Sequence, residues 1–229
     1  MHTENVTFPV NGDSERGYLA QPDGDGPFPA VVVIQEWWGL DDHIKSLVGR
    51  FAGEGFVALA PDLYHGQVAT EPDDARKLVM ELNMDVALSE IRAAMSYLTD
   101  LPVVQPKRIC IIGFCMGGRL SLATASTGDS RIGAVAAFYG GGVQPTPEFV
   151  RGITAPVLAV YGELDGGIPP EQYNALAAEM DKQAKTFDMV VYPGAEHAFM
   201  NDSRPSYNPG AAADAWTRAV QWFTSNVRT

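Results

Sequence analysis

The sequence predicts an α/β protein with a mostly parallel, twisted sheet and helices on both faces. Short, uninterrupted apolar runs alternate with longer segments of helical periodicity from residue 30 onward. Runs without a polar face are typical of strands that are buried on both sides in a parallel sheet. The length of 229 residues fits a single domain of this class, and residues 1–229 are therefore expected to form one.

The first buried strand is expected over Ala30–Gln35 (AVVVIQ). Asp41 or Asp42 then offers an N-cap for a helix, because apolar residues recur at helical spacing from Ile44 to Phe51. The run Phe56–Ala60 (FVALA) follows as the next buried strand. This segment therefore has the strand–helix–strand order that joins two parallel strands.

The same alternation continues to the C-terminus. Further strands are predicted over Arg108–Gly113, Ile132–Phe138, Val157–Tyr161 and Phe187–Tyr192. Further helices are predicted over Met84–Leu98, Gly117–Ala125, Glu171–Lys182 and Trp216–Val227. Ligands of such folds bind beyond the carboxyl ends of the strands, so polar residues that follow a strand are the candidates for function.

The segment Gly113–Gly118 (GFCMGG) joins a predicted strand to a predicted helix. It has the G-x-nucleophile-x-G pattern of a tight strand-to-helix turn, with Cys115 at the nucleophile position. The positive N-terminus of the following helix favours a thiolate there, and the N–H of Met116 is expected to donate to an oxyanion. The alternative is a structural cysteine, since cysteine is often a small core residue.

Two later loops contain the partners that such a turn requires, in the order acid and then histidine. Asp165 follows the strand Val157–Tyr161, and His197 follows the strand Phe187–Tyr192. Taken singly, Asp165 could be a turn or capping residue and His197 a surface histidine. The agreement of three separate placements favours a catalytic Cys–His–Asp triad.

These motifs resemble the dienelactone hydrolase (carboxymethylenebutenolidase) family of the α/β-hydrolase fold. The resemblance extends from about Phe28 to Phe223, nearly the whole chain. It rests on Gln35–Gly39 (QEWWG), Ala60–Tyr64 (APDLY), Gly113–Gly118, Gly162–Asp165 and Gly194–Phe199. The cysteine in the turn and the Gln-Glu pair are the most specific of these features.

The resemblance implies that Cys115 is the nucleophile, His197 the base and Asp165 the residue that orients the base. It also implies that Glu36 approaches the resting thiol and helps to generate the thiolate, and that the N–H of Trp37 is the second oxyanion donor. From the residues alone, Glu36 is a carboxylate at the end of an apolar strand. If buried, its pKa is raised and it can accept a proton; otherwise it is a polar residue emerging from the sheet.

The implied reaction is hydrolysis of a carboxylic ester or lactone through a thioester. A thiolate expels an enolate-like leaving group more readily than an alkoxide, so activated esters and enol lactones are the expected substrates. No metal and no organic cofactor is expected. The alternatives are a general carboxylesterase or thioesterase with no role in aromatic degradation, and a non-catalytic ligand-binding member of the fold.

The sequence departs from the best-known members of the family where they bind the substrate carboxylate. Those members use two arginines, and this chain has Asn201 at one position and Glu71-Pro72 at the other. Arg76 and Arg204 lie near these positions in the sequence and are candidate substitutes, although either is equally compatible with a solvated surface. Dienelactone itself is therefore doubtful as the substrate.

Aromatic residues at the strand ends are weaker candidates for substrate binding. Trp38, Tyr64 and Phe199 are expected to line the pocket together with Trp37. Aromatic side chains at such positions are as often part of the core.

The formal net charge of −12 opposes binding to nucleic acid or to an anionic membrane surface. There is no secretory signal pattern and no apolar run of the ~20 residues that a membrane span needs. The two cysteines, Cys110 and Cys115, are not expected to form a disulfide, and a functional free thiol suits the cytoplasm. We therefore expect a cytoplasmic monomer or small homo-oligomer that binds a small-molecule ester or lactone.

Overall fold

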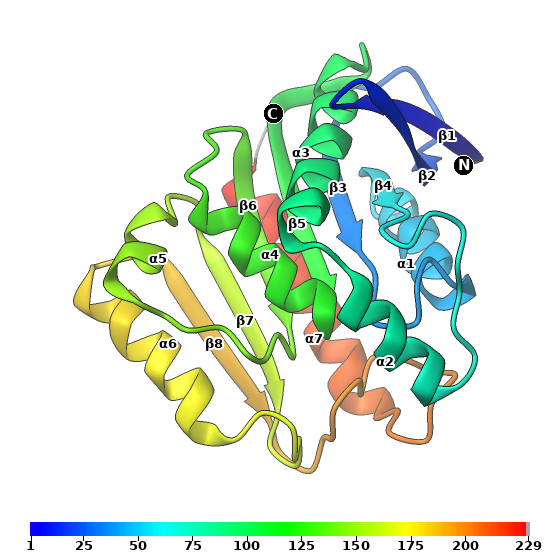
Figure 1. The fold of residues 1–229 in the computed structure, drawn as a ribbon. Coiled ribbons are helices and arrows are strands. Elements are labelled where there is room, and N and C mark those ends of the chain that lie inside the picture. The colour runs from blue at the N-terminus through cyan, green and yellow to red at the C-terminus, as the bar shows by residue number, and fades with distance from the viewer. Residues whose placement is uncertain (228–229) are drawn as a thin grey trace.

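The computed structural model describes residues 1–227, which form one sheet covered by helices (Figure 1). The strands are β1 (His2–Val10), β2 (Asp13–Gln21), β3 (Phe28–Ile34), β4 (Val57–Pro61), β5 (Val104–Phe114), β6 (Ile132–Phe138), β7 (Val157–Gly162) and β8 (Phe187–Tyr192). The helices are α1 (Asp42–Gly53), α2 (Pro72–Glu81), α3 (Met84–Asp100), α4 (Met116–Ser126), α5 (Pro147–Gly152), α6 (Pro170–Lys182) and α7 (Pro209–Asn226).

The strand order is β1-β2-β4-β3-β5-β6-β7-β8, with parallel pairing from β4 to β8. β2 pairs antiparallel with both β1 and β4. The predicted mostly parallel sheet is thus confirmed. Because β3 and β5 are neighbours in register, with Ile34 opposite Gly113, the residues that follow these two strands emerge at the same edge of the sheet.

The sheet has helices on both faces, as predicted. α1 and α7 cover one face, and α3, α4, α5 and α6 cover the other (Figure 1). On the first face, Phe51 of α1 packs against Trp216 of α7 with the ring centroids 4.5 Å apart. On the second face, Ile91, Met95 and Leu98 of α3 are fully buried. Each helix therefore buries the apolar stripe that its sequence shows.

The antiparallel hairpin of β1 and β2 is the largest element that the sequence analysis did not assign. Buried and exposed residues alternate along it, because only one face packs on the core, and its polar outer residues conceal the strand pattern. The signal that predicts it is Asn11-Gly12, whose residues have φ angles of 49° and 94°. Asn-Gly is a favoured two-residue hairpin turn.

Several element ends differ from the predicted ones. β5 begins at Val104 rather than Arg108, because its exposed first half contains Pro106 and Lys107 and has no apolar pattern. The short helix α5 was not predicted, since six residues contain less than two helical turns. Between the two N-cap candidates of α1 it is Asp41 that accepts a hydrogen bond from the Ile44 N–H, at 3.0 Å.

None of the helices described over residues 1–227 is both long and apolar enough to cross a bilayer. α2 lies apart from the two helical layers, at the end of the sheet where β3 and β5 terminate (Figure 1). There Trp38, Ala69 and Ala75 form a small buried cluster, with Trp37 and Leu78 packed against it. α2 and the loop before it therefore form one side of the region beyond the strand ends.

The turn between β5 and α4 depends on close backbone packing at two glycines. A Cβ atom at Gly113 would lie 2.0 Å from the carbonyl oxygen of Gly117. A Cβ atom at Gly117 would lie 2.4 Å from the carbonyl oxygen of Ile34 in β3. Both contacts are with backbone, so no side-chain movement can relieve them, and only glycine fits at either position.

We expect the substitution Gly113→Ala to lower the free energy of unfolding by about 3 kcal/mol or more, because the added methyl group overlaps backbone atoms. Urea denaturation measures the loss. The matched control is Gly53→Ala in α1, where the new Cβ meets nothing within 4 Å, and its stability should stay within about 1 kcal/mol of the parent. Equal stability of the two variants would contradict this account of the turn.

Candidate active site

Cys115 occupies the turn between β5 and α4, half-buried, with a φ of 55° and a ψ of −116°. This conformation is strained for a residue with a side chain, and such strain persists only where the surrounding structure holds it in place. The thiol is therefore held at the edge of the sheet, at the N-terminus of α4. The sequence pattern predicted this turn, although α4 begins at Met116 rather than at Gly117.

His197 and Asp165 lie on the loops after β8 and β7, which are neighbouring strands. The His197 Nδ1 and the Asp165 Oδ2 are 2.6 Å apart. Asp165 is buried, and its other oxygen accepts a hydrogen bond from the Gly167 N–H at 2.9 Å. The carboxylate thereby fixes the imidazole with Nδ1 as the donor, which leaves Nε2 free to act on a substrate or nucleophile.

The imidazole of His197 also interacts with the Cys115 side chain. Burial works to lower the pKa of His197, but hydrogen bonds to Asp165 and Cys115 outweigh it and raise the pKa to about 10. A histidine with this pKa is protonated at neutral pH when a thiolate is beside it. The structure thus brings Cys115, His197 and Asp165 together in the order that the sequence predicted.

Glu36 follows β3 and is almost completely buried. Its Oε2 accepts a hydrogen bond from the Asn201 Nδ2 at 2.8 Å, and its Oε1 accepts one from the Tyr139 hydroxyl at 3.4 Å. Burial raises the pKa of the Glu36 carboxyl to about 7. In the described part of the chain these two residues, rather than Cys115, are the hydrogen-bond partners of the carboxylate.

Tyr139 and Asn201 are the two residues of the site that sequence reasoning did not assign to it. Tyr139 follows β6 with a φ of 39°, is fully buried, and has its ring centroid 5.0 Å from that of His197. The sequence signal that could have assigned Tyr139 to the site is its position directly after a buried strand. Asn201 was noted only as a departure from the arginine of relatives, and that position indeed faces the site, as an anchor for Glu36.

The candidate oxyanion donors are the amides of Trp37 and Met116. Trp37 follows β3 and Met116 opens α4, so both lie at the edge where β3 and β5 end. Among the hydrogen bonds of loops and caps described over residues 1–227, neither amide is a donor. Both N–H groups thus remain available to a ligand.

A cavity of about 470 Å³ opens at this site. Its lining includes Trp37, Trp38, Cys115, His197 and Arg204. The Arg204 guanidinium lies over the Trp38 ring, 3.6 Å from its centroid, and the Arg204 Nε is buried without a hydrogen-bond partner among the described residues. The cavity therefore combines an aromatic wall with the Arg204 guanidinium, which a cation–π contact holds, and Glu196 also lines it.

Three other predicted binding residues do not line this cavity. Arg76 lies on an exposed face of α2, where it pairs with Asp73 at 2.8 Å. Tyr64 is buried with its hydroxyl 3.3 Å from the Met116 sulfur, and Phe199 is fully buried against Tyr139. Tyr64 and Phe199 thus pack beneath the site, against Met116 and Tyr139 respectively. Arg76 lies outside the site.

The combination of this sheet topology with a nucleophile turn, a loop acid and a loop histidine is that of an α/β-hydrolase. The model of the dienelactone hydrolase family matches residues 16–227. The chain is 37% identical to "Protein usf" of Aquifex pyrophilus, over 95% of this chain and 96% of that protein. It is 35% identical to a "putative carboxymethylenebutenolidase" of Aquifex aeolicus strain VF5, over 97% and 98%.

Among solved structures, a "putative dienelactone hydrolase" from Klebsiella pneumoniae subsp. pneumoniae MGH 78578 superposes with a TM-score of 0.89 at 31% identity. The match covers 97% of this chain and 98% of that one. The chain belongs to the dienelactone hydrolase family. Both the α/β-hydrolase fold and the class of enzyme that the sequence predicted are confirmed.

We expect the stability of the protein to depend on pH through Glu36. The neutral carboxyl is favoured in the folded state, because its pKa there is about 7 against an ordinary value of 4.5. Its stabilising effect is complete below about pH 4.5 and is lost as the pH rises through 7. Relative to a Glu36→Gln variant, the parent should lose about 2 to 3 kcal/mol of unfolding free energy between pH 5 and pH 8.

Denaturant unfolding of parent and variant at several pH values measures this difference. Glu171→Gln, at an exposed position at the start of α6, controls for the loss of one negative charge. Parallel pH profiles for the parent and Glu36→Gln would show that burial does not perturb this carboxyl.

Proposed function

We propose that the protein hydrolyses carboxylic esters or lactones with Cys115 as the nucleophile, through a thioester intermediate. The observation that carries the proposal is the joint position of the strained Cys115 turn and the His197–Asp165 pair on one cavity. A strained nucleophile beside a base that a carboxylate orients is the arrangement required for covalent acyl transfer.

The proposed reaction starts from a thiolate on Cys115 and an imidazolium on His197, in keeping with the raised pKa of this histidine. The sulfur attacks the ester carbonyl, and the N–H groups of Trp37 and Met116 stabilise the oxyanion that forms. The tetrahedral intermediate collapses to a thioester, and His197 donates its proton to the departing oxygen. His197 then takes a proton from the water that attacks the thioester, which releases the acid and restores the Cys115 thiolate beside the His197 imidazolium.

Glu36 is proposed to accept the proton of the resting Cys115 thiol, as the family resemblance implies; the thiolate then stands beside a His197 imidazolium that took its proton from solvent. A carboxyl with a pKa of about 7 can gain or lose a proton at neutral pH at little cost. Asn201 and Tyr139 hold this group in place by hydrogen bonds from either side. These contacts support the proposal that Glu36 is a fixed carboxyl group that can accept a proton.

The cavity favours an activated ester or enol lactone that carries an acidic group. Its aromatic wall suits a planar substrate, and the guanidinium of Arg204 lines the cavity as a cation that the reaction itself does not use. Asn201 replaces the arginine with which known members bind a carboxylate and is occupied with Glu36. This replacement favours the second candidate function, a carboxylesterase or thioesterase with a substrate other than dienelactone.

We expect an activated ester such as p-nitrophenyl acetate to leave an acetyl group on Cys115. Rapid acid quenching followed by mass spectrometry of the peptides detects the adduct, because the thioester survives at low pH. Cys110→Ala is the matched control: Cys110 is fully buried in β5, and burial raises the pKa of its thiol, so the adduct should persist without it.

Hydrolysis that continues unchanged in Cys115→Ala would exclude Cys115 as the nucleophile. Ligand binding by the parent without hydrolysis of any ester, lactone or thioester tested would instead favour the non-catalytic alternative. Comparing cis-dienelactone, p-nitrophenyl acetate and acyl thioesters separates the two hydrolase readings.

We expect Arg204→Met to lower kcat/KM by roughly 10- to 100-fold for esters that bear a free carboxylate, because a hydrogen bond to a charged group contributes about 1.5 to 3 kcal/mol. The methionine keeps an apolar contact with Trp38, so neutral esters should be little affected. Steady-state kinetics on a matched acidic and neutral pair measure the ratio. Arg76→Met, on the exposed face of α2, should leave both rates unchanged; an equal loss for both substrates in Arg204→Met would argue against carboxylate binding.

A further inference from the structure

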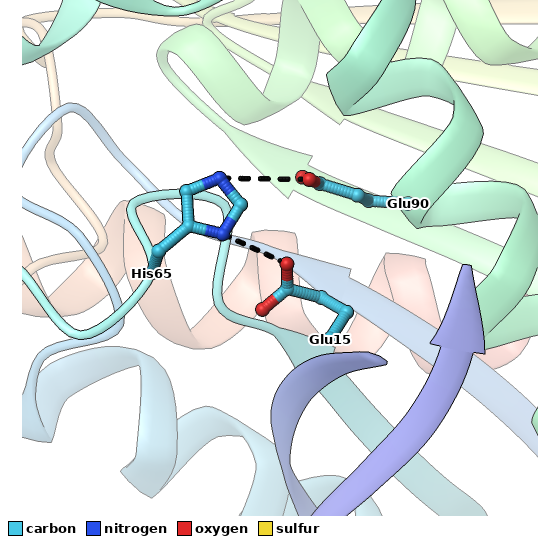
Figure 2. A group of neighbouring side chains, drawn as sticks. All are labelled: Glu15, His65 and Glu90. Atoms are coloured by element: carbon cyan, nitrogen blue, oxygen red, sulfur yellow. Dashed lines mark ion pairs between the residues drawn. The ribbon is translucent and has the colours of Figure 1, made fainter. Parts of the chain in front are cut away.

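A second group of ionisable side chains lies outside the candidate active site and has no part in the reaction above. Glu15 comes from β2, His65 from the turn after β4, and Glu90 from α3 (Figure 2). The imidazole lies between the two carboxylates, with its Nδ1 2.8 Å from the Glu15 Oε2 and its Nε2 3.5 Å from the Glu90 Oε1. Three segments far apart in the sequence thus converge on one point.

Both carboxylates of this group are buried, while His65 is exposed. Glu15 and Glu90 are 5% and 3% exposed, and the Glu90 Oε2 has no hydrogen-bond partner among the described residues. A buried carboxylate oxygen without a partner lowers the stability of the fold, because it has lost its hydrogen bonds to water and gained none from the protein. The Glu90 Oε2 is therefore available to bind a ligand from outside the protein.

The local charge balance points to a cation. The ion pairs described for Glu15 and Glu90 are with His65, and none is with a lysine or arginine. A third carboxylate, Asp62, lies on the same turn, where it accepts hydrogen bonds from the N–H groups of Tyr64 and Gly66. Two buried carboxyl groups thus share a single imidazole, which carries at most one positive charge.

We propose that Glu15, His65 and Glu90 form a binding site for a divalent transition-metal cation of the Zn²⁺ type. One imidazole nitrogen and two carboxylate oxygens are ligands that such ions accept. One ligand atom from each residue lies within 4.8 Å of the other two. Ligand bonds of about 2.0 to 2.2 Å require these atoms to lie roughly 3 to 3.5 Å apart, so a small inward movement of the exposed imidazole completes the site.

Two cavities that border the group give the ion a route and room for water ligands. A cavity of about 290 Å³ is lined by Glu15, His65 and Glu90. A second, of about 170 Å³, is lined by His65 and Glu90 together with Tyr64. Three protein ligands leave a fourth position for water, and the bound ion would join β2, α3 and the turn after β4.

The probe for this site is Zn²⁺ itself, added to protein freed of metal with a chelator. Because a free thiol also binds zinc, the titration uses the full chain with Cys115→Ser next to the parent. We expect one Zn²⁺ to bind per chain by isothermal titration calorimetry in Cys115→Ser, and at least one in the parent, whose thiol can bind a second. At a hundredfold excess of free Zn²⁺ over Kd, the Tm should rise by roughly 5 to 10 °C.

Two variants, made in the Cys115→Ser protein, test the ligands. Glu90→Gln keeps the size of the side chain, and His65→Asn suits a backbone φ of 52°, since asparagine tolerates the left-handed region. Each should weaken Zn²⁺ binding at least about tenfold and abolish the rise in Tm. The matched control is His2→Asn, which removes an exposed histidine 3.4 Å from a single carboxylate, that of Glu4, and should bind as its parent does.

Circular dichroism of the metal-free variants shows whether they fold, which distinguishes loss of zinc binding from unfolding. If either variant does not fold, Glu15→Gln replaces it. Absence of zinc binding in Cys115→Ser would overturn the proposal. Binding that survives in both ligand variants, or that is lost in His2→Asn, would place the ion elsewhere and would equally overturn it. The same titration with Mg²⁺ should give no shift, because the imidazole favours transition metals over hard cations.

Discussion

The close backbone contact among β3, β5 and α4 is the constraint on which the rest of the candidate site depends. Gly113 and Gly117 allow carbonyl groups to approach where any side chain would overlap them. This contact holds Cys115 in a conformation that a free peptide avoids, and the pairing of Ile34 with Gly113 brings the end of β3 to the same edge. Both candidate oxyanion donors and the nucleophile therefore have their positions set by backbone.

The pKa values of the ionisable groups at this edge depend on burial and on hydrogen bonds. Burial disfavours the charged form of each group, and the hydrogen bonds favour it. His197 keeps its charge because Asp165 and Cys115 outweigh the cost of burial. At Glu36 the balance is the reverse, since burial outweighs the hydrogen bond from Asn201 and raises the pKa. Both groups therefore keep a proton to a higher pH than they do in water, His197 in its charged form and Glu36 in its neutral form, and such perturbed groups are typical of sites that move protons.

The sequence predicted the parts of the structure that depend on local pattern. The buried runs of β3 to β7 and the apolar stripes of α1, α3 and α7 carry their signal within a few residues, as does the turn at Cys115. The hairpin of β1 and β2 was missed because it is half-exposed, and its polar outer face hides the pattern. Tyr139 and Asn201 were missed for a different reason: they meet Glu36 across 103 and 165 residues of chain, and no local pattern encodes such contacts.

The pocket aromatics illustrate the same limit. Strand-end position predicted that Trp38, Tyr64 and Phe199 would all line the cavity. Of these three only Trp38 does so, with Arg204 stacked on its ring, whereas Tyr64 and Phe199 are buried in the interior. Sequence position fixes the end of the sheet at which a residue lies; packing then decides the direction of its side chain.

The two cysteines differ sharply in accessibility, although they belong to one strand and the turn that ends it. Cys115 is half-buried on the cavity, and Cys110 is enclosed by the sheet and its helices. A colorimetric thiol reagent should therefore titrate one equivalent quickly in the native protein and the second only when β5 separates from its neighbours. The slow equivalent reports opening of the central sheet, so the chain contains its own kinetic probe of global unfolding without any added label.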